Sequence, residues 1–519
     1  MLGVSTKIFL TVFLFSSTIA VLVQFLILPY LLPQIHAGHG ILGLIGNRGD
    51  LLLFHRMAAE TAEIIRTQGL SAIEWNRFGG SHSTLFGIIY ALTTSEPYVL
   101  IPFQAGLHAL AAVTLYRLIF SICQSQRLAI ASIIPFSILP TPAFWYTQNH
   151  KEGLAILGFF LCLSCWATLA DSKTYQTDSL RKFVLAISAL FVSMGLLALS
   201  RTQLIEITYY LSLYGIVPLL LIIRINGAYQ RRSSITSVLV FGVIATSLIL
   251  FQNWANTQTG QLLTSSENYE FTKKMSQTTA PPSQIDPSIG EKDVASTPKK
   301  QSLHGIDPNT GTKVSKKKPE VMGPPSPLFP FRWEGTPSIP VSLDRKFFAL
   351  NAVRAGYRRT APFAHTSVGI EHMPKNAVES VLMVPHAWKV ALFSPFPRHW
   401  SLREAKGASQ IMRLVGAFEM LLAYLLFPFA VYFIYSYRKS ERLWPILGLS
   451  FGTLTILGYV ITNAGTLHRS RYGFMMVLVG MGAAGIIKSF SHLRHWQRKT
   501  GSTKKPFTNP GLSAANQTG

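Results

Sequence analysis

Residues 8–32, IFLTVFLFSSTIAVLVQFLILPYLL, contain no charged side chain and directly follow the single basic residue Lys7. A run of this length can cross the hydrocarbon layer of a bilayer, which is roughly 30 Å thick. A cleavable signal peptide has a shorter apolar core of about 7 to 15 residues, followed by a small-residue cleavage site. The sequence therefore predicts a retained membrane anchor at this position.

The composition of the whole chain supports the same class of protein. Of the 519 residues, 49% are hydrophobic and 13% are charged, and the mean hydropathy is +0.30. Soluble domains usually carry about a quarter charged residues. The composition therefore excludes an ordinary cytoplasmic globular enzyme. The net charge is +24. In a membrane protein, such an excess of basic residues indicates loops that face the cytoplasm.

Nine further apolar runs predict transmembrane helices, so we expect an all-α polytopic membrane protein with about ten spans. These runs are residues 99–120, 128–146, 153–170, 183–200, 207–223, 235–251, 411–435, 443–462 and 472–487. Residues 84–94 are short for a full crossing, and we interpret them as a re-entrant or juxtamembrane segment. Basic loops then fall on the side of Lys7, and the positive-inside rule places both termini in the cytoplasm.

The spans and loops divide the chain into five parts. We expect an N-terminal transmembrane module at residues 1–256 with a first outer loop at 33–97, a disordered extracytoplasmic insertion at 257–335, an extracytoplasmic juxtamembrane segment at 336–410, C-terminal transmembrane helices at 411–488 and a basic cytoplasmic tail at 489–519. The insertion is rich in Ser, Thr, Pro, Gly and Lys, which is typical of disorder. Residues 343–359 instead predict an amphipathic helix.

Two carboxylates lie at the start of predicted helices on the outer side. Asp50 begins the amphipathic segment DLLLFHRMAAE, and Glu152 follows His150 and Lys151 in NHKEG, just before a span. Either residue can simply favour the positive end of a helix dipole. A carboxylate at the outer membrane surface can also serve as a general base toward an acceptor hydroxyl. Both readings stay open from the residues alone.

Other polar residues near the outer face suggest an anionic ligand. Arg201 lies in a short turn, and Glu419 lies inside the span at 411–435, where it requires a partner on another helix or on a ligand. The last outer turn, NAGTLHRSRYGF, carries His468, Arg469, Arg471 and Tyr472. Arginine's planar fork suits phosphate, so a lipid-linked phosphate is one partner for these arginines. Lipid headgroups or the acidic residues are the alternative.

Several other classes of function lack support in the sequence. We find no nucleotide-binding loop, no HExxH motif and no GxGxxG after a strand. Basic residues are spread over both membrane faces, which argues against nucleic acid as a partner. The CxxC of Cys162 and Cys165 lies in an apolar run and suits packing, and the HAGH segment at residues 36–39 is a weak metal motif.

The layout resembles the GT-C superfamily of membrane glycosyltransferases. The resemblance rests on GDLLLFHRMAAE at residues 49–60, GGSHSTLFGIIYALTTSEPYVLIPFQAGLHALAAVTLYRLIF at 79–120, ILPTPAFWYTQNHKEGLAILGFFL at 138–161, LALSRTQ at 197–203, SPFPRHW, GAFEMLLAYLL and NAGTLHRSRYGFMMV. It covers most of the chain except residues 257–331. Each motif is short.

The resemblance implies a sugar transfer from a polyprenyl-phosphate-linked donor to a glycan, lipid or protein acceptor. It implies an inverting reaction on the extracytoplasmic face of a bacterial inner membrane. Asp50 would be the base and Glu152 a second acid; Arg201, Arg469 and Arg471 would contact the donor phosphate, and Glu419, His468 and Tyr472 would complete the substrate site. The chain has one acid at Asp50 where many members have a pair, which leaves a divalent metal cofactor open.

Three alternatives remain at this level. A polysaccharide polymerase or ligase would use a lipid-pyrophosphate glycan with a similar layout. A transporter or flippase of lipid-linked glycans usually has internal repeats and a site at the membrane midplane, whereas the polar residues here gather at the outer ends of spans. A non-catalytic membrane subunit would tolerate alanine at Asp50, Arg469 and Arg471.

Overall fold

The computed structural model describes residues 2–42, 50–73, 75, 81–171, 179–212, 331–360, 367–401 and 408–501. Helices dominate this part of the chain, and it contains no β-strand. The chain divides into two compact units. Unit 1 comprises Met1–Gln261, Phe363–Gly369 and Val384–Gly519, and unit 2 comprises Leu262–Pro362 and Ile370–Met383.

Seven helices among the described residues are long and apolar enough to cross a membrane, and all lie in unit 1. They are Gly3–Leu31, Pro97–Cys123, Glu152–Ala170, Arg181–Ser200, Gln410–Tyr437, Leu443–Val460 and Ala464–His492. They correspond to seven of the ten predicted spans. The fold is therefore helical with several membrane-spanning helices, as the hydropathy predicts.

The other three predicted spans have different outcomes. Residues 128–146 form two helices, α5 (Gln126–Ile138) and α6 (Pro140–Trp145), rather than one. The break follows from Pro140, because the residue before a proline is driven out of the helical conformation, and Leu139 is extended. Most of 207–223, beyond the end of α9 (Thr202–Leu211), and all of 235–251 lie outside the described residues.

The spans pack around a central helix. They lie in α1 (Leu2–Leu22, continued as a π-helix over Val23–Leu31), α4 (Ile101–Cys123), α7 (Glu152–Ala170), α8 (Ser179–Ser200), α16 (Ala408–Tyr437), α17 (Leu443–Val460) and α18 (Ala464–Gly501). Helix α7 packs against α4, α8, α17 and α18, and 83% of its span is buried, against 28% for the first span. A helix that is apolar on all sides belongs inside, whereas α1 leaves an apolar side for lipid.

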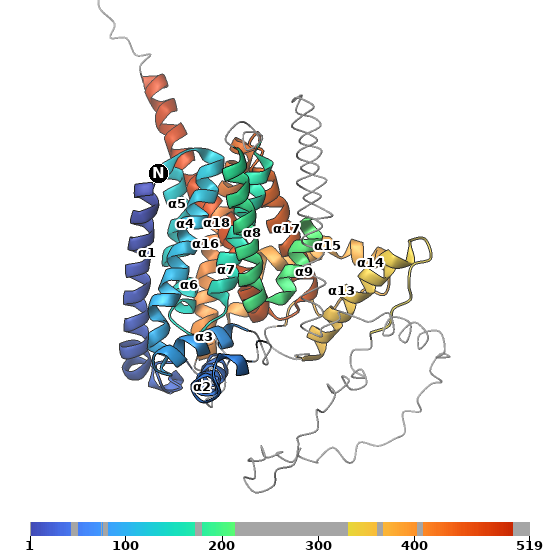
Figure 1. Ribbon diagram of the computed structural model, residues 1–519. Helices are drawn as coiled ribbons and strands as arrows, with labels where there is room; N and C mark the ends of the chain where they lie inside the picture. The colour runs from blue at the N-terminus through green and yellow to red at the C-terminus, as the bar shows by residue number, and fades with distance from the viewer. Residues whose placement is uncertain are drawn as a thin grey trace, which may run out of the picture. The chain divides into compact units, whose positions relative to one another are not determined.

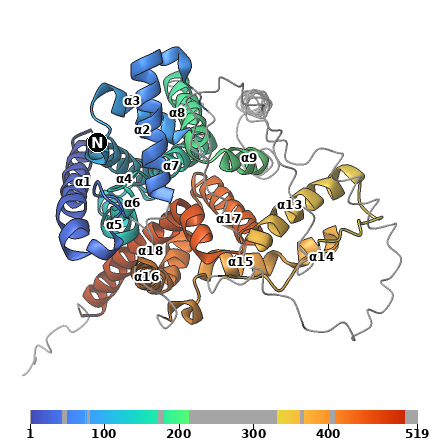
Figure 2. The ribbon, with the colours of Figure 1, turned by 90° about the horizontal axis from the view of Figure 1, so that it is seen from below.

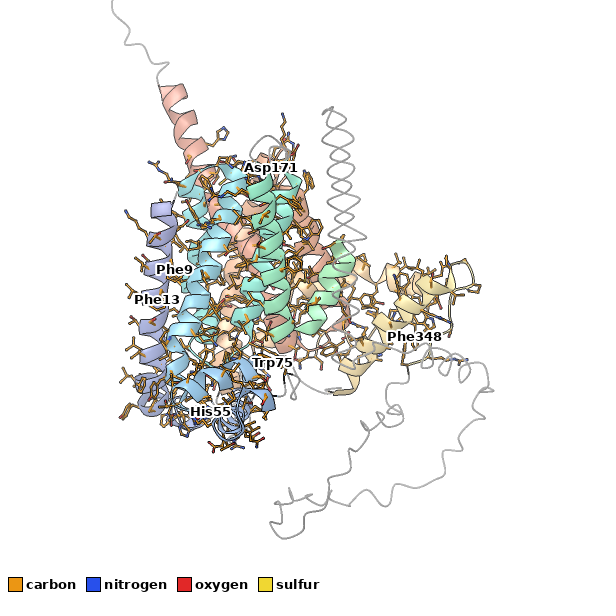
Figure 3. The ribbon with its side chains drawn as sticks, viewed as in Figure 1. Phe9, Phe13, His55, Trp75, Asp171 and Phe348 are labelled. Carbon is orange, nitrogen blue, oxygen red and sulfur yellow. The ribbon has the colours of Figure 1, made fainter. Side chains whose placement is uncertain are left out.

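An amphipathic helix and a short apolar helix lie across one end of unit 1, which we name the α2 end. Helix α2 (Asp50–Gln68) packs against α3 (His82–Leu92), and both lie where α1 ends (Figures 1 and 2). Helix α3 has eleven residues, which agrees with the expectation that residues 84–94 do not form a full crossing. Figure 3 labels His55 and Trp75 at this end of the unit.

The opposite end of unit 1 holds the start of α1 and the end of α18 (Figure 1). Asp171, labelled there in Figure 3, accepts a hydrogen bond from Arg442. Arg442 also donates to the carbonyl of Ser121, and Arg117 donates to Ser5. These contacts join the helix ends at the end of unit 1 where α1 begins.

Unit 2 contains the amphipathic helix that the sequence predicts at residues 343–359, observed as α13 (Val341–Thr360), and the short α14 (Ala377–Leu382). Trp333 packs against Phe348 and donates to Asp344 over 3.0 Å. Asn351 donates to Ser380 over 2.9 Å, which joins the two helices. The predicted segment 336–410 is thus shared between the units, since α15 (Val384–Phe393) belongs to unit 1. Most of the predicted insertion at 257–335 lies outside the described residues.

Glycines bring α16 and α18 into close contact, which generates a prediction. A side-chain carbon on Gly485 would overlap the carbonyl oxygen of Phe429, and one on Gly482 would lie 2.5 Å from that of Leu426. We expect Gly485→Ala to destabilise the protein by about 1–3 kcal/mol, because overpacking separates the helices. Gly195→Ala on α8 is the control, since nothing lies within 4 Å of the added carbon. Thermal unfolding in detergent measures both, and equal melting temperatures would contradict the packing.

Candidate functional site

The N-terminal part of α18 organises the α2 end. Asn463 precedes the helix, and its side-chain oxygen accepts from the backbone N–H groups of Gly465 at 3.0 Å and Thr466 at 3.1 Å. This contact satisfies donors that every helix start leaves unpaired. The five residues from His468 to Tyr472 then point to different neighbours, since successive helical residues are rotated by about 100°. Arg469, Ser470 and Arg471 each contact a different element, whereas His468 and Tyr472 both lie near Glu419.

Arg469 pairs with Asp50, the first residue of α2. The guanidinium lies 3.0 Å from the carboxylate, and the side chains are 42% and 63% exposed. Residues 419 positions apart therefore meet at the end of the bundle. An exposed pair of this kind is worth only about 0–1 kcal/mol. Both groups can exchange their mutual contact for a ligand at small energetic cost.

Glu152 and Arg201 form a buried pair beside it. Their nearest atoms are 2.7 Å apart, with the carboxylate 4% and the guanidinium 17% exposed. The second oxygen of Glu152 lies 3.0 Å from His150, and Arg201 also donates to Ser470 over 3.1 Å. Glu152 is therefore engaged on both oxygens. This geometry suits a residue that orients Arg201 better than one that contacts an acceptor.

Lys151 is a third cation at this end, and our sequence reasoning left it out of the site. Burial, and then the positive charge of Arg201, lower the pKa of Lys151, while Glu152 and Asp50 oppose that shift. Its ammonium lies 5.6 Å from the centre of the Phe54 ring on α2. Lys151 lies between His150 and Glu152 in NHKEG. Adjacent opposite charges of this kind often serve only to anchor a helix end at the membrane interface, so the sequence carries no signal that Lys151 belongs to a site.

Three basic side chains surround Glu152 and Asp50 at the α2 end. Lys151, Arg201 and Arg469 interact with these two carboxylates, so this group has one more basic than acidic side chain. Charges in a partly buried setting act more strongly than in water because the local dielectric constant is lower. The arrangement can attract an anionic group while keeping one exposed carboxylate beside it.

Glu419 has its partners on other helices. One oxygen accepts from the backbone N–H of Thr141 on α6 at 2.7 Å, and the other lies 3.6 Å from the imidazole of His468. Tyr472, one turn further along α18, places its ring 5.5 Å from that of His468. The structure thus brings these three predicted residues together, but inside the bundle rather than beside Asp50.

Arg471 occupies a different place from Arg469. It is 1% exposed, and it donates to the carbonyl oxygens of Val390 and Ala391. These carbonyls belong to the last turn of α15 (Val384–Phe393), where a helix leaves acceptors unpaired and attracts cations. Arg471 therefore caps α15 and joins it to α18. Because Arg471 is buried and bonded to these carbonyls, it does not suit the contact with a donor phosphate that the sequence suggests.

The described residues offer no evident metal site. No group of three or more His, Cys, Asp or Glu side chains among them has the geometry to hold a metal ion. His36 accepts from the backbone N–H of Gly40 at 3.0 Å, whereas His39 lies 2.9 Å from Glu96. The two histidines of HAGH thus have separate partners. Cys162 and Cys165 are free, buried thiols on α7.

Comparison with known proteins finds no matching family model, no matching curated protein and no matching solved structure.

The capping role of Arg471 predicts a loss of stability. We expect Arg471→Ala to lower the free energy of unfolding by at least about 2 kcal/mol, because it leaves the carbonyls at the end of α15 unpaired in a buried setting. Arg469→Ala, which removes the exposed neighbouring arginine, should cost less than about 1 kcal/mol. Thermal unfolding in detergent compares the two variants. Equal losses would show that Arg471 does not hold α15.

A buried histidine under α2 predicts acid sensitivity. His82 is fully buried, with its ring 4.3 Å from that of Phe54. Burial, and then nearby Lys151, lower the pKa of His82 to about 3. The unfolded chain, with an ordinary histidine pKa near 6.5, therefore takes up a proton first as the pH falls. Below pH 6.5, stability should fall by about 1.4 kcal/mol per pH unit from this residue.

This contribution should disappear in His82→Gln, which cannot titrate in this range. Thermal unfolding of both proteins between pH 7 and pH 5 makes the comparison. A wild-type slope no steeper than that of the variant would mean that His82 is not held neutral by its surroundings.

Proposed function

We propose that this protein is an integral membrane glycosyltransferase that transfers a sugar from a polyprenyl-phosphate-linked donor to a glycan, lipid or protein acceptor. The supporting observation is the exposed Asp50–Arg469 pair at the α2 end, with Lys151 and Arg201 close by. A carboxylate that can accept a proton thus lies next to three basic side chains. The GT-C-like layout of the sequence supports the same class of enzyme.

The proposed reaction uses these groups in separate roles. Asp50 accepts the proton of the acceptor hydroxyl, and the hydroxyl oxygen attacks the anomeric carbon of the sugar. The bond between that carbon and the phosphate oxygen breaks, and the electron pair remains on the phosphate. Arg469 and Lys151 stabilise the negative charge of the departing phosphate. One bond forms and one breaks, with inversion at the anomeric carbon.

Glu152 supports the reaction indirectly in this proposal. Because both of its oxygens have partners, its role is to position Arg201 rather than to act on the acceptor. The site as a whole lies at the end of unit 1 opposite the start of α1, the helix that carries Lys7 near its beginning (Figure 1). The positive-inside rule therefore favours an extracytoplasmic active face and cytoplasmic termini.

The role of Asp50 is tested by complementation of a deletion strain with Asp50→Asn. The change removes the basic oxygen with little change in volume, so we expect glycan transfer to fall by about 100-fold or more. Polyprenyl-phosphate-linked sugar should accumulate in the same membranes. Glu63→Gln, which neutralises another exposed acid on α2, is the matched control and should retain full activity.

Protein abundance in the membrane is measured for each variant. Full transfer by Asp50→Asn at wild-type abundance would exclude Asp50 as the base. Accumulation of a lipid-pyrophosphate-linked glycan in place of the polyprenyl-phosphate-linked sugar would favour the polymerase, ligase or transporter alternatives.

A further inference from the structure

The turn between α16 and α17 and the nearby part of α18 carry basic side chains without an acidic partner. Arg438, Lys439 and Lys488 form no ion pair with any residue that the structure describes. Arg442 in the same turn is paired with Asp171. Glu441, the acidic residue of the turn, has an interaction of its own. Within the described part of the chain, three positive charges at this place therefore lack a counter-ion.

Close packing of α16 and α18 brings these three residues together. Lys488 lies one turn after Gly485, where α18 meets the backbone of α16 at Phe429. The ammonium of Lys488 lies 3.7 Å from the centre of the Tyr437 ring on α16. Tyr437 directly precedes Arg438 and Lys439 in the chain. The basic side chains thus gather where two packed helices end. We name Arg438, Lys439 and Lys488 the basic cluster.

Aromatic contacts hold the basic cluster in position without neutralising it. The guanidinium of Arg438 lies 4.0 Å from the centre of the Tyr435 ring and donates to the Tyr435 carbonyl over 2.8 Å. The indole of Trp444 donates to the carbonyl of Arg438 over 3.0 Å, which fixes the turn. A cation above an aromatic ring is attracted to it but keeps its charge. Arg438, which is exposed, can use its other N–H donors for a ligand.

The surroundings of the basic cluster are apolar and exposed. Tyr435 is 62% exposed, Trp444 40%, Ile487 41% and Phe490 58%. They belong to helices that are long and apolar enough to cross a membrane. Tyrosine and tryptophan are typical of the boundary between a membrane and water. A water-soluble anion would leave these side chains uncovered, so the ligand has an apolar part as well as a negative charge.

We propose that the basic cluster binds the headgroup of an anionic phospholipid, with the acyl chains of the lipid along α16 and α18. Basic groups between membrane helices are suited to such headgroups. A zwitterionic lipid fits less well, because its own ammonium group is repelled by the three cations. The site is separate from the proposed reaction, since Arg442 and Asp171 place this turn at the end of unit 1 opposite the α2 end (Figure 3).

The test is native mass spectrometry of the full-length protein with three probes. These are phosphatidylglycerol, phosphatidylcholine with the same acyl chains, and free glycerol phosphate. The wild type should bind phosphatidylglycerol at least about 10-fold more tightly than phosphatidylcholine, because each cation near an anionic headgroup contributes roughly 5-fold. Free glycerol phosphate should not bind at the same concentrations.

The triple variant Arg438→Gln/Lys439→Gln/Lys488→Gln removes the charges of the basic cluster. Its affinity for phosphatidylglycerol should fall by at least about 10-fold, with phosphatidylcholine binding unchanged. The matched control is Arg494→Gln/Arg498→Gln/Lys499→Gln, which removes the same number of charges further along α18 and should bind as the wild type does. Arg438→Lys/Lys439→Arg keeps the charges and should also bind as the wild type does.

Every other outcome overturns the proposal. Equal binding of the two phospholipids by the wild type, or an unchanged preference in the triple variant, would show that the basic cluster does not select an anionic lipid. An equal loss in the control variant would mean that net charge, and not this place, attracts the lipid. Loss in the charge-preserving variant would point to a change in fold. Binding of free glycerol phosphate would show an anion site that needs no lipid.

Discussion

The buried ion pair between Glu152 and Arg201 is the interaction on which the α2 end depends. Its charges lie 2.7 Å apart inside an apolar bundle, where either charge alone would carry a desolvation penalty of several kcal/mol. Glu152 begins α7, and Arg201 follows the end of α8. Arg201 also donates to Ser470 of α18. The pair therefore fixes three helix ends relative to one another, and it places the neighbouring Arg469 against Asp50.

The rotation of an α-helix explains why neighbouring residues of α18 differ so much in role. His468 contacts Glu419, Arg469 contacts Asp50, and Arg471 caps α15. Steps of about 100° separate successive side chains, so a shift of two positions moves an arginine from the exposed end of the bundle into its interior. The same chemical group is thus available to a ligand at Arg469 and committed to structure at Arg471.

Hydropathy predicts most of the helices because polar residues are scarce in the chain and mark where the spans end. Because polar residues are scarce, Asp50, Glu152, Arg201 and Arg469 stand out in the sequence as charged side chains near the membrane that require a partner or a function. Their pairing could not be read from the sequence, since Glu152 and Arg201 are 49 positions apart and Asp50 and Arg469 are 419 apart. The sequence also contains the cause of the break at Leu139, which is Pro140. The continuous apolar character of residues 128–146 nevertheless predicts a single span, because hydropathy does not register the conformation that a proline imposes.

The order of groups along the α2 end determines how a donor and an acceptor would meet in the proposed reaction. The exposure of the side chains decreases from Asp50, at 63%, through Arg469, at 42%, to His468, at 18%, and Glu419, at 3%. In the proposed reaction, an acceptor hydroxyl from the aqueous side would therefore reach Asp50 first. The phosphate would lie next to it at Arg469, where its charge is stabilised after the bond breaks. His468 and Glu419 lie deeper and contact each other, so the decrease in exposure separates the reacting groups from the residues that hold the helices together.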